Sequence, residues 1–298
     1  MVAASHRERA PALLVLAGAC AIAFCVLYLI FVRTGHGQRI DEAALQGRGV
    51  ANQGQPAADR LLKTISIASL VIATAVLAGQ ALIRRRADLS LVAAAVIAGS
   101  VISAELLKGV ILTRPILYAG PLPHASFPSG HTAIAFSVGV AAILVVPARL
   151  RNWAAFAAVL YGSAIGIAAV AAGWHRPSDV AGSLLLVTAW AAGVVALSDR
   201  AVTALRSATD PPTGEWPRPA VSRRYLLAGG VLLAAGYLGA VAIAFASQAG
   251  AIDWTLGNAA FFAACAAILA LAAVLIAALL AALRVGSRDI GVPAVAPR

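Results

Sequence analysis

The chain alternates between long apolar runs and short polar stretches along nearly its whole length. A helix needs about 20 mostly apolar residues to cross the hydrocarbon core of a bilayer, and runs of this length recur throughout the sequence. The pattern predicts an all-α fold, a polytopic bundle of membrane helices. We expect about eight transmembrane helices, at residues 11–32, 61–83, 89–112, 129–147, 153–173, 180–197, 225–246 and 257–283.

The same pattern divides the chain into four parts. Residues 1–197 hold six of the spans and are expected to form one helical membrane domain. Residues 198–224 are polar and contain a Pro-Pro-Thr-Gly stretch, which is typical of a linker. Two additional transmembrane helices are predicted within 225–283, followed by a cytoplasmic tail at 284–298.

Composition agrees with a membrane protein. Hydrophobic residues make up 61% of the 298 positions and charged residues 12%, whereas soluble domains carry roughly 25% charged residues. The first span follows two arginines, as the core of a signal peptide would, but it is longer than such a core and no small-residue cleavage site follows it. We therefore expect an uncleaved first helix.

Membrane topology accounts for the net charge of +11, and nucleic acid is not expected as a partner. Cytoplasmic loops of membrane proteins carry an excess of Lys and Arg. With the N-terminus in the cytoplasm, 15 of the 23 Lys and Arg residues fall on the cytoplasmic side and 8 on the other. The short loops Arg84–Arg86 and Arg149–Arg151 decide the orientation, with both termini inside. Cys20, Cys25 and Cys265 lie within predicted spans without a Cys-x-x-Cys spacing, and we interpret them as packing residues.

Ionisable residues gather where the predicted spans end. Ionisable groups beside a bilayer are costly and indicate function. Lys108 and Arg114 lie at the end of the third span, His131 begins the fourth, and His175 and Asp179 lie between the fifth and sixth. The alternation of the spans brings all of these ends to the same membrane face. Two histidines, a carboxylate and two cations are enough to transfer a phosphoryl group without a metal.

Each of these residues has a physical role in such a site. Ser129 is a plausible N-cap, and Gly130 lets an anion approach the free N–H groups of a helix N-terminus. His175 and Asp179 are four residues apart, so on a helical turn the carboxylate faces one ring nitrogen and orients the other. Pro177 suits a first helical turn.

These residues closely resemble the motifs of the type 2 phosphatidic acid phosphatase (PAP2) family, which shares its site with the vanadium haloperoxidases. The family shows Lys-x6-Arg-Pro, Pro-Ser-Gly-His and Ser-Arg-x5-His-x3-Asp. The second motif is intact here as Pro128-Ser129-Gly130-His131, and His175 and Asp179 complete the third. The resemblance covers a motif core at about 61–197, within the six-helix unit.

The resemblance implies a role for each site residue. His175 would be the nucleophile that forms a phosphohistidine, Asp179 would orient it, and His131 would protonate the leaving oxygen. Lys108 and Arg114 would bind the phosphate oxygens. No cofactor and no metal are expected.

Two departures from the family pattern bear on function. Lys108 and Arg114 are separated by five residues rather than six, and the Ser-Arg pair of the third motif falls on Ala168-Ala169. A charge-assisted hydrogen bond contributes about 1.5–3 kcal/mol, so losing one phosphate ligand would weaken binding roughly 10- to 100-fold. Arg176, directly after His175, is a candidate replacement if the chain turns there.

Other polar residues near the motifs have simpler interpretations. Glu105 is interpreted as an ion-pair partner of Lys108 rather than a catalytic acid, and His124 as a solvated loop histidine. Trp174 is interpreted as a membrane-interface anchor. The outer loop 33–60, which contains Asp41 and Glu42, carries no recognisable chemistry.

The sequence therefore predicts a metal-independent phosphatase in the cell membrane. It would hydrolyse a lipid-linked phosphate monoester or diphosphate on the extracytoplasmic face, with membrane lipids as its surroundings and with its oligomeric state open. Two alternatives remain. One is a lipid phosphotransferase, in which a hydroxyl rather than water takes the phosphoryl group. The other is a non-catalytic lipid-binding or transport protein, motivated by Ala169.

Overall fold

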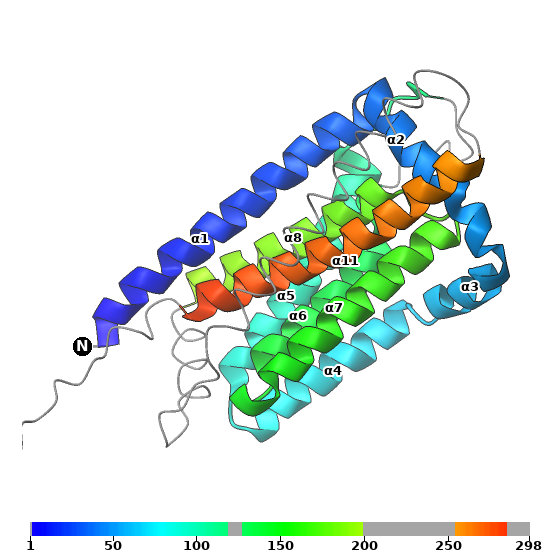
Figure 1. The fold of residues 1–298 in the computed structure, drawn as a ribbon. Coiled ribbons are helices and arrows are strands. Elements are labelled where there is room, and N and C mark those ends of the chain that lie inside the picture. The colour runs from blue at the N-terminus through cyan, green and yellow to red at the C-terminus, as the bar shows by residue number, and fades with distance from the viewer. Residues whose placement is uncertain (1, 119–126, 199–253, 285–298) are drawn as a thin grey trace, which may run out of the picture.

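A computed structural model describes residues 2–118, 127–198 and 254–284 (Figure 1). In this part of the chain the elements are helical and no strand is present. They are α1 (Val2–Leu27), the π-helical turn η1 (Tyr28–Val32), α2 (Gly35–Gln46), the 3-10 segment η2 (Gly47–Gly54), α3 (Gln55–Lys63), α4 (Ile67–Ile83), α5 (Ala87–Leu106), the π-helical turn η3 (Leu107–Ile111), α6 (Gly130–Val145), α7 (Ala148–Ala171), α8 (Pro177–Leu197) and α11 (Trp254–Arg284). The prediction of an all-α polytopic bundle is confirmed.

Five of the described helical stretches are long and apolar enough to cross a membrane: Ala10–Val32, Ala87–Ile111, Arg149–Ala171, Pro177–Leu197 and Gly257–Leu283. Each overlaps a predicted span. The linker predicted at 198–224 lies, apart from its first residue, outside the described residues, as do the span predicted at 225–246 and, apart from its first residue, the tail predicted at 284–298.

Two predicted spans differ from the structure. The run at 61–83 is not one straight helix, because α3 and α4 meet at a bend of 60°. Ser66 causes the break: it caps α4 by accepting a hydrogen bond from Ser69 N (3.1 Å), and its own N–H donates to Ser69 Oγ (2.9 Å). The helix predicted at 129–147 is the 16-residue α6, which is shorter than the usual length for a full span.

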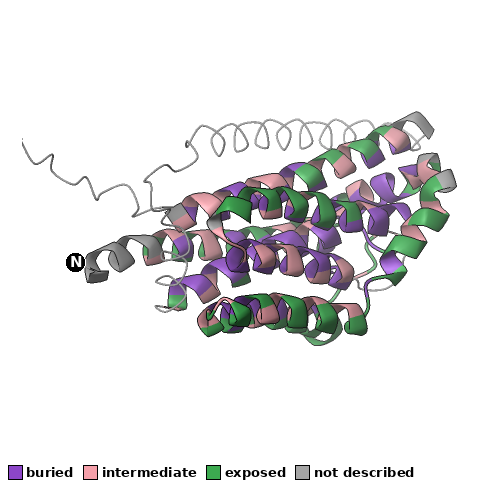
Figure 2. Ribbon diagram, turned by 90° about the horizontal axis from the view of Figure 1, so that it is seen from below, coloured by how far each residue is buried: buried purple, intermediate pink, exposed green. Residues whose placement is uncertain are grey.

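The bundle is built around α6 and α8. Side chains that face the interior, such as Phe136, Leu144 and Leu184, are fully buried. Apolar side chains on the outside, such as Ile83 (86% exposed), instead face outward, as expected where lipid is the solvent. Figure 2 shows this division, with the buried residues facing neighbouring helices and the exposed ones on the outer surface.

One end of the bundle is covered by the segment predicted to be the loop 33–60. This segment is helical: α2, η2 and α3 follow one another across that end (Figure 1). Thr34 starts α2 as its N-cap, accepting a hydrogen bond from Gly37 N at 3.0 Å. The segment thus forms a cover, which we call the α2–α3 cover (residues 35–63).

The α2–α3 cover is supported by α11. This helix packs along α7, α8 and α2. At its start, a β-carbon added to Gly47 would lie only 1.8 Å from the carbonyl oxygen of Gly257, so the two backbones are in direct contact. Helix α11 therefore contacts the cover over the same end of the bundle at which the predicted site residues lie.

Candidate active site

The two motif histidines lie side by side, at the starts of two neighbouring helices. His131 is in the first turn of α6, His175 lies two residues before the first residue of α8, and their ring centroids are 6.2 Å apart. Two hydrogen bonds join the helix starts: Ser129 N donates to Asp179 O (3.0 Å), and Ser183 Oγ donates to Ser129 O (2.7 Å). Ser129 is the N-cap of α6, as predicted.

Asp179 faces His175 but not in the way the sequence suggested. His175 does not lie on a helical turn, because α8 begins at Pro177 with Arg176 as its N-cap. The carboxylate, which is fully buried, accepts a hydrogen bond from Arg176 N at 2.9 Å, and this closes the turn. Its Oδ2 then lies 3.5 Å from Nδ1 of His175. With Nδ1 on the carboxylate side, Nε2 is the nitrogen left to react.

Arg114 supplies a buried guanidinium to the same place. Its Nη2 lies 3.3 Å from Asp179 Oδ1 and 3.8 Å from Asp41 Oδ2, and its side chain is 4% exposed. Nε and Nη1 are buried and donate no hydrogen bond within the described part of the chain. Buried N–H groups without an acceptor are costly, and an anion beside them would supply acceptors.

Asp41 is a second carboxylate of the site, and sequence reasoning missed it. It accepts hydrogen bonds from Ser178 N (3.1 Å) and from Ser178 Oγ, and so joins α2 to the first turn of α8. Burial and the nearby Asp179 carboxylate raise the pKa of Asp41 to about 7, against the opposing effects of Arg114 and Ser178.

Glu42, the next residue, holds Arg176. Its Oε2 lies 3.5 Å from Arg176 Nη2, and both side chains are buried. Burial raises the pKa of Glu42, and the neighbouring Arg176 opposes this rise. The predicted contact of Arg176 with phosphate stays a prediction. The only sequence signal for Asp41 and Glu42 was two adjacent acids in a chain with just 12.

Lys108 reaches the start of α6 from the π-helical turn η3. Its Nζ lies 2.8 Å from Glu105, so the interpretation of Glu105 as its ion-pair partner is confirmed. A β-carbon on Gly130 would lie 3.6 Å from Lys108 Nζ and 2.5 Å from Glu105 Oε1. Because Gly130 has no side chain, charged groups can approach the N-terminus of α6 closely.

Gln38 holds the loop that carries Arg114, and it too was missed. Its Nε2 donates to Val32 O (2.8 Å) and Pro115 O (2.7 Å). Its Oε1 accepts from Leu117 N (3.2 Å) and Tyr118 N (3.1 Å). The buried amide thus satisfies four backbone groups and fixes the residues directly after Arg114.

Position 169, where the family motif carries arginine, is filled by packing. Ala169 is fully buried in an apolar cluster with Leu62 of the α2–α3 cover and with Ile65, in the bend between α3 and α4. Its carbonyl accepts hydrogen bonds from Trp174 N (2.9 Å) and His175 N (3.2 Å), so it shapes the turn that leads into His175. A guanidinium has no room at this position while α3 packs there.

The structure also bears on Trp174, His124 and the three cysteines, which the sequence analysis interpreted as residues without a catalytic role. Trp174 stands edge-on to His131, with ring centroids 5.3 Å apart, and is 38% exposed. His124 lies outside the described residues. Cys20 is buried, Cys25 is exposed on α1 and Cys265 is half-buried, all three as free thiols. No group of three or more His, Cys, Asp or Glu within the described ranges is arranged to hold a metal ion.

Comparison with known proteins gives one match. A family model described as the PAP2 superfamily matches residues 16–202, which is more than half of the chain and includes every motif residue discussed above. No curated protein and no solved structure matches the chain.

The amide of Gln38 gives the first prediction. Gln38→Leu leaves four backbone groups without their partner, but only the contact to Val32 O is buried and the other three are part-buried. A buried unsatisfied group costs about 1–3 kcal/mol, and a part-buried one costs less because water can reach it. We expect the free energy of unfolding to fall by about 2–5 kcal/mol, and the site to lose the position of Arg114. Thermal stability in detergent measures the effect, with His36→Leu, an exposed residue of the same helix, as control. Equal stability of the two variants would contradict the role of the clamp.

A second prediction concerns the proton on Asp41. The folded protein binds this proton more tightly than the unfolded chain, in which the pKa is near the ordinary value of 3.8. The stability that the proton contributes is therefore fully present below about pH 4 and is lost as the pH rises through about 7. Asp41→Asn cannot ionise, so its thermal stability should change less with pH across this window. Asp88→Asn, at the other end of the bundle, serves as control, and an unchanged pH profile in Asp41→Asn would contradict the assignment.

Proposed function

The chain belongs to the PAP2 superfamily, and on that premise we propose that it is an integral-membrane phosphatase that hydrolyses a lipid-linked phosphate monoester or diphosphate through a phosphohistidine. Members of this superfamily are generally phosphatases. The observation that carries the proposal is the arrangement of His175, Asp179 and His131 beside the buried guanidinium of Arg114.

The proposed reaction has two steps, each with a group in place. Nε2 of His175 attacks phosphorus while Asp179 stabilises the charge that develops on the imidazole. The bond from phosphorus to the leaving oxygen breaks, and His131 gives that oxygen a proton. In the second step His131 takes a proton from water, the water oxygen attacks the phosphohistidine, and phosphate leaves with His175 restored.

Cations and a helix start would hold the phosphoryl group during both steps. Arg114 contributes the N–H groups of its buried nitrogens Nε and Nη1, and Lys108 lies beside Gly130 at the N-terminus of α6. Ser129 caps that helix. Charge-assisted hydrogen bonds of this kind are the stronger ones, and they stabilise charge that grows in the transition state. Arg176 is a further candidate, since it follows the nucleophile directly.

A lipid-linked substrate fits the surroundings of the site. The residues that flank Arg114 expose large apolar side chains: Val110 is 78% exposed, Ile111 63%, Ile116 73% and Leu117 50%. Soluble domains bury most residues of this type. At the end of a bundle of membrane helices, these side chains would face the acyl chains of the substrate while its phosphate enters the polar site.

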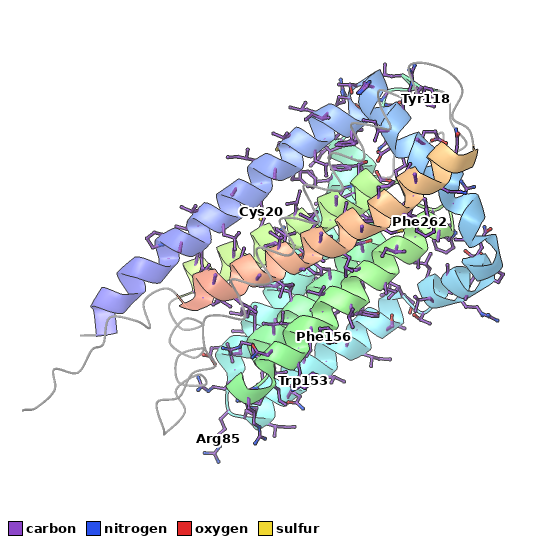
Figure 3. The ribbon with its side chains drawn as sticks, in the orientation of Figure 1. Cys20, Arg85, Tyr118, Trp153, Phe156 and Phe262 are labelled. Atoms are coloured by element: carbon purple, nitrogen blue, oxygen red, sulfur yellow. The ribbon has the colours of Figure 1, made fainter. Side chains whose placement is uncertain are left out.

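The site is proposed to lie on the extracytoplasmic face. The basic loops at 84–86 and 149–151 support this side through the positive-inside rule. Figure 3 shows Arg85 and Trp153 at one end of the bundle and Tyr118, which follows Arg114 by four residues, at the other. The arginine-rich loops and the site are therefore at opposite ends.

The proposed activity is tested by phosphate release. Purified protein in mixed micelles is assayed with phosphatidate, phosphatidylglycerol phosphate and a polyprenyl diphosphate, with EDTA present throughout. Release from at least one of these substrates, abolished in His175→Ala, is the expected result. A protein that binds lipid phosphates but releases nothing would instead favour the non-catalytic alternative, for which Ala169 is the motivation. Transfer of the phosphoryl group to an added lipid hydroxyl in preference to water would identify a phosphotransferase.

The third prediction separates the two histidines. His175→Ala has no nucleophile, so no phosphohistidine should be trapped with any substrate. His131→Ala lacks the proton donor, and a nitrophenyl phosphate needs little protonation of its leaving oxygen. We expect this variant to lose about 10²–10⁴-fold with a lipid phosphate and far less with nitrophenyl phosphate. Equal losses on both substrates would assign His131 another role.

The fourth prediction concerns orientation. A reporter that is active only outside the cytoplasm should work when fused after Arg176 and stay silent when fused within 84–86. Each of the two fusions serves as the control for the other, because they lie at opposite ends of the bundle. The reverse pattern would place the site in the inner leaflet.

A further inference from the structure

The site lacks the arginine of the third motif, and the α2–α3 cover holds an arginine at the turn that precedes the nucleophile. This turn contains Gly173, whose φ of +76° is in the left-handed region that favours glycine. A β-carbon on Gly173 would lie 2.8 Å from Nε and 3.3 Å from Nη2 of Arg48. The guanidinium thus lies directly against the backbone of residue 173, two residues before His175.

Two contacts hold Arg48 in this position, one made by its own side chain and one made by the residue before it. Its Nη1 donates a hydrogen bond to Leu45 O at 2.9 Å, at the end of α2. The residue before it, Gly47, lies against the backbone of Gly257 at the start of α11. Nε, Cζ and Nη2 of Arg48 all lie within 3.3 Å of the position that a β-carbon on Gly173 would take, and neither Nε nor Nη2 donates a hydrogen bond within the described ranges.

Charge balance distinguishes Arg48 from the other cations of the site. Each of those three lies within 4 Å of a carboxylate: Lys108 pairs with Glu105, Arg114 with Asp179 and Asp41, and Arg176 with Glu42. Arg48 makes no such ion pair with any residue that the structure describes, although its charge lowers the pKa of Glu42. Its positive charge is therefore the one in the described site that no carboxylate neutralises at short range.

A phosphate ester needs such a charge. Three cations already paired with carboxylates offer a dianion little net positive charge, and a guanidinium with one edge available can donate two parallel hydrogen bonds to phosphate. The place where the family carries its arginine is closed here, because Ala169 is packed under α3. The same cover that closes position 169 delivers Arg48 to the turn four residues later.

We propose that Arg48 is a phosphate-binding residue of the active site and replaces the arginine absent at position 169. This proposal rests on the proposed phosphatase function for its substrate, a lipid-linked phosphate. In it, η2 is part of the active site, and α11 positions Arg48 through the contact between Gly47 and Gly257.

Orthovanadate, which mimics five-coordinate phosphorus, is the probe that tests Arg48. Arg48→Ala loses a charge-assisted hydrogen bond to the bound vanadate. This variant should therefore need about 10- to 100-fold more vanadate than the natural protein for the same inhibition. Arg48→Lys keeps the charge without the fork geometry and should fall between Arg48→Ala and the natural protein. Arg60→Ala removes an exposed arginine of the same cover, and vanadate should inhibit this variant as strongly as it inhibits the natural protein. An Arg48→Ala variant with lowered thermal stability and unchanged vanadate inhibition would overturn the proposal, because Arg48 would then only brace the turn.

A glycine pair tests the positioning by η2 and α11. Gly47→Ala puts a methyl group against Gly257, whereas nothing lies within 4 Å of a β-carbon on Gly54 in the same segment. Gly47→Ala should weaken vanadate inhibition in the same direction as Arg48→Ala, and Gly54→Ala should leave it unchanged. Equal inhibition in both glycine variants would overturn the positioning role of α11.

A phosphate-binding measurement, which needs no enzyme activity, separates this proposal from the phosphatase function. Inorganic phosphate should raise the thermal stability of the purified protein, by mass action on the folded state. Arg48→Ala should need about 10- to 100-fold more phosphate for the same shift. If no lipid phosphate is hydrolysed but this difference is seen, the phosphatase function fails and the role of Arg48 stands. If phosphate shifts the natural protein and Arg48→Ala equally, or shifts neither, the role of Arg48 is refuted.

Discussion

The carboxylate of Asp179 is the interaction on which the rest of the site depends. It is fully buried, and a buried charge is tolerated only when it is paired and hydrogen-bonded. One oxygen accepts from Arg176 N and faces His175, while the other faces Arg114. A single carboxylate therefore closes the turn before α8, faces the ring of His175 and holds a guanidinium from the segment after α5. Removing it would leave the buried guanidinium of Arg114 with only the more distant carboxylate of Asp41, and weakening the pairing of a buried charge is destabilising.

Asp41 extends this arrangement to the α2–α3 cover. It binds the first turn of α8 through Ser178 and shares Arg114 with Asp179. The cover is thus joined to the site by polar contacts that the bundle cannot supply by itself, and Gln38 adds a second connection to the loop after Arg114. The active end of the molecule is assembled from α6 and α8, which carry the histidines, and from a cover that sets the position of their cationic partners.

The membrane spans and the motif residues could be read from the sequence because each rests on a local rule. Span length follows from bilayer thickness, and Ser129 and Pro177 follow from the chemistry of helix starts. The cover could not be read in this way. Its apolar content is low, so it resembles a loop, and α2 is stabilised mainly by contacts to residues far away in sequence, such as that of Asp41 with Ser178, 137 residues later. The bend at Ser66 was hidden for the opposite reason, since the apolar run continues through it while a local cap at Ser66 starts a new helix.

The position of the cover also explains how the site can lack an arginine at 169 without losing its shape. The small residues Ala168, Ala169 and Ala172 let α3 pack closely on the end of α7. That packing removes water from the back of the turn and leaves the carbonyl of Ala169 to hold Trp174 and His175. A long cation there would separate α3 from α7, and with it the connection of the cover to the bundle. Alanine at 169 and a helical cover therefore belong together: packing against α3 keeps the geometry of the turn before His175, and it leaves no room on α7 for a long cation at this position.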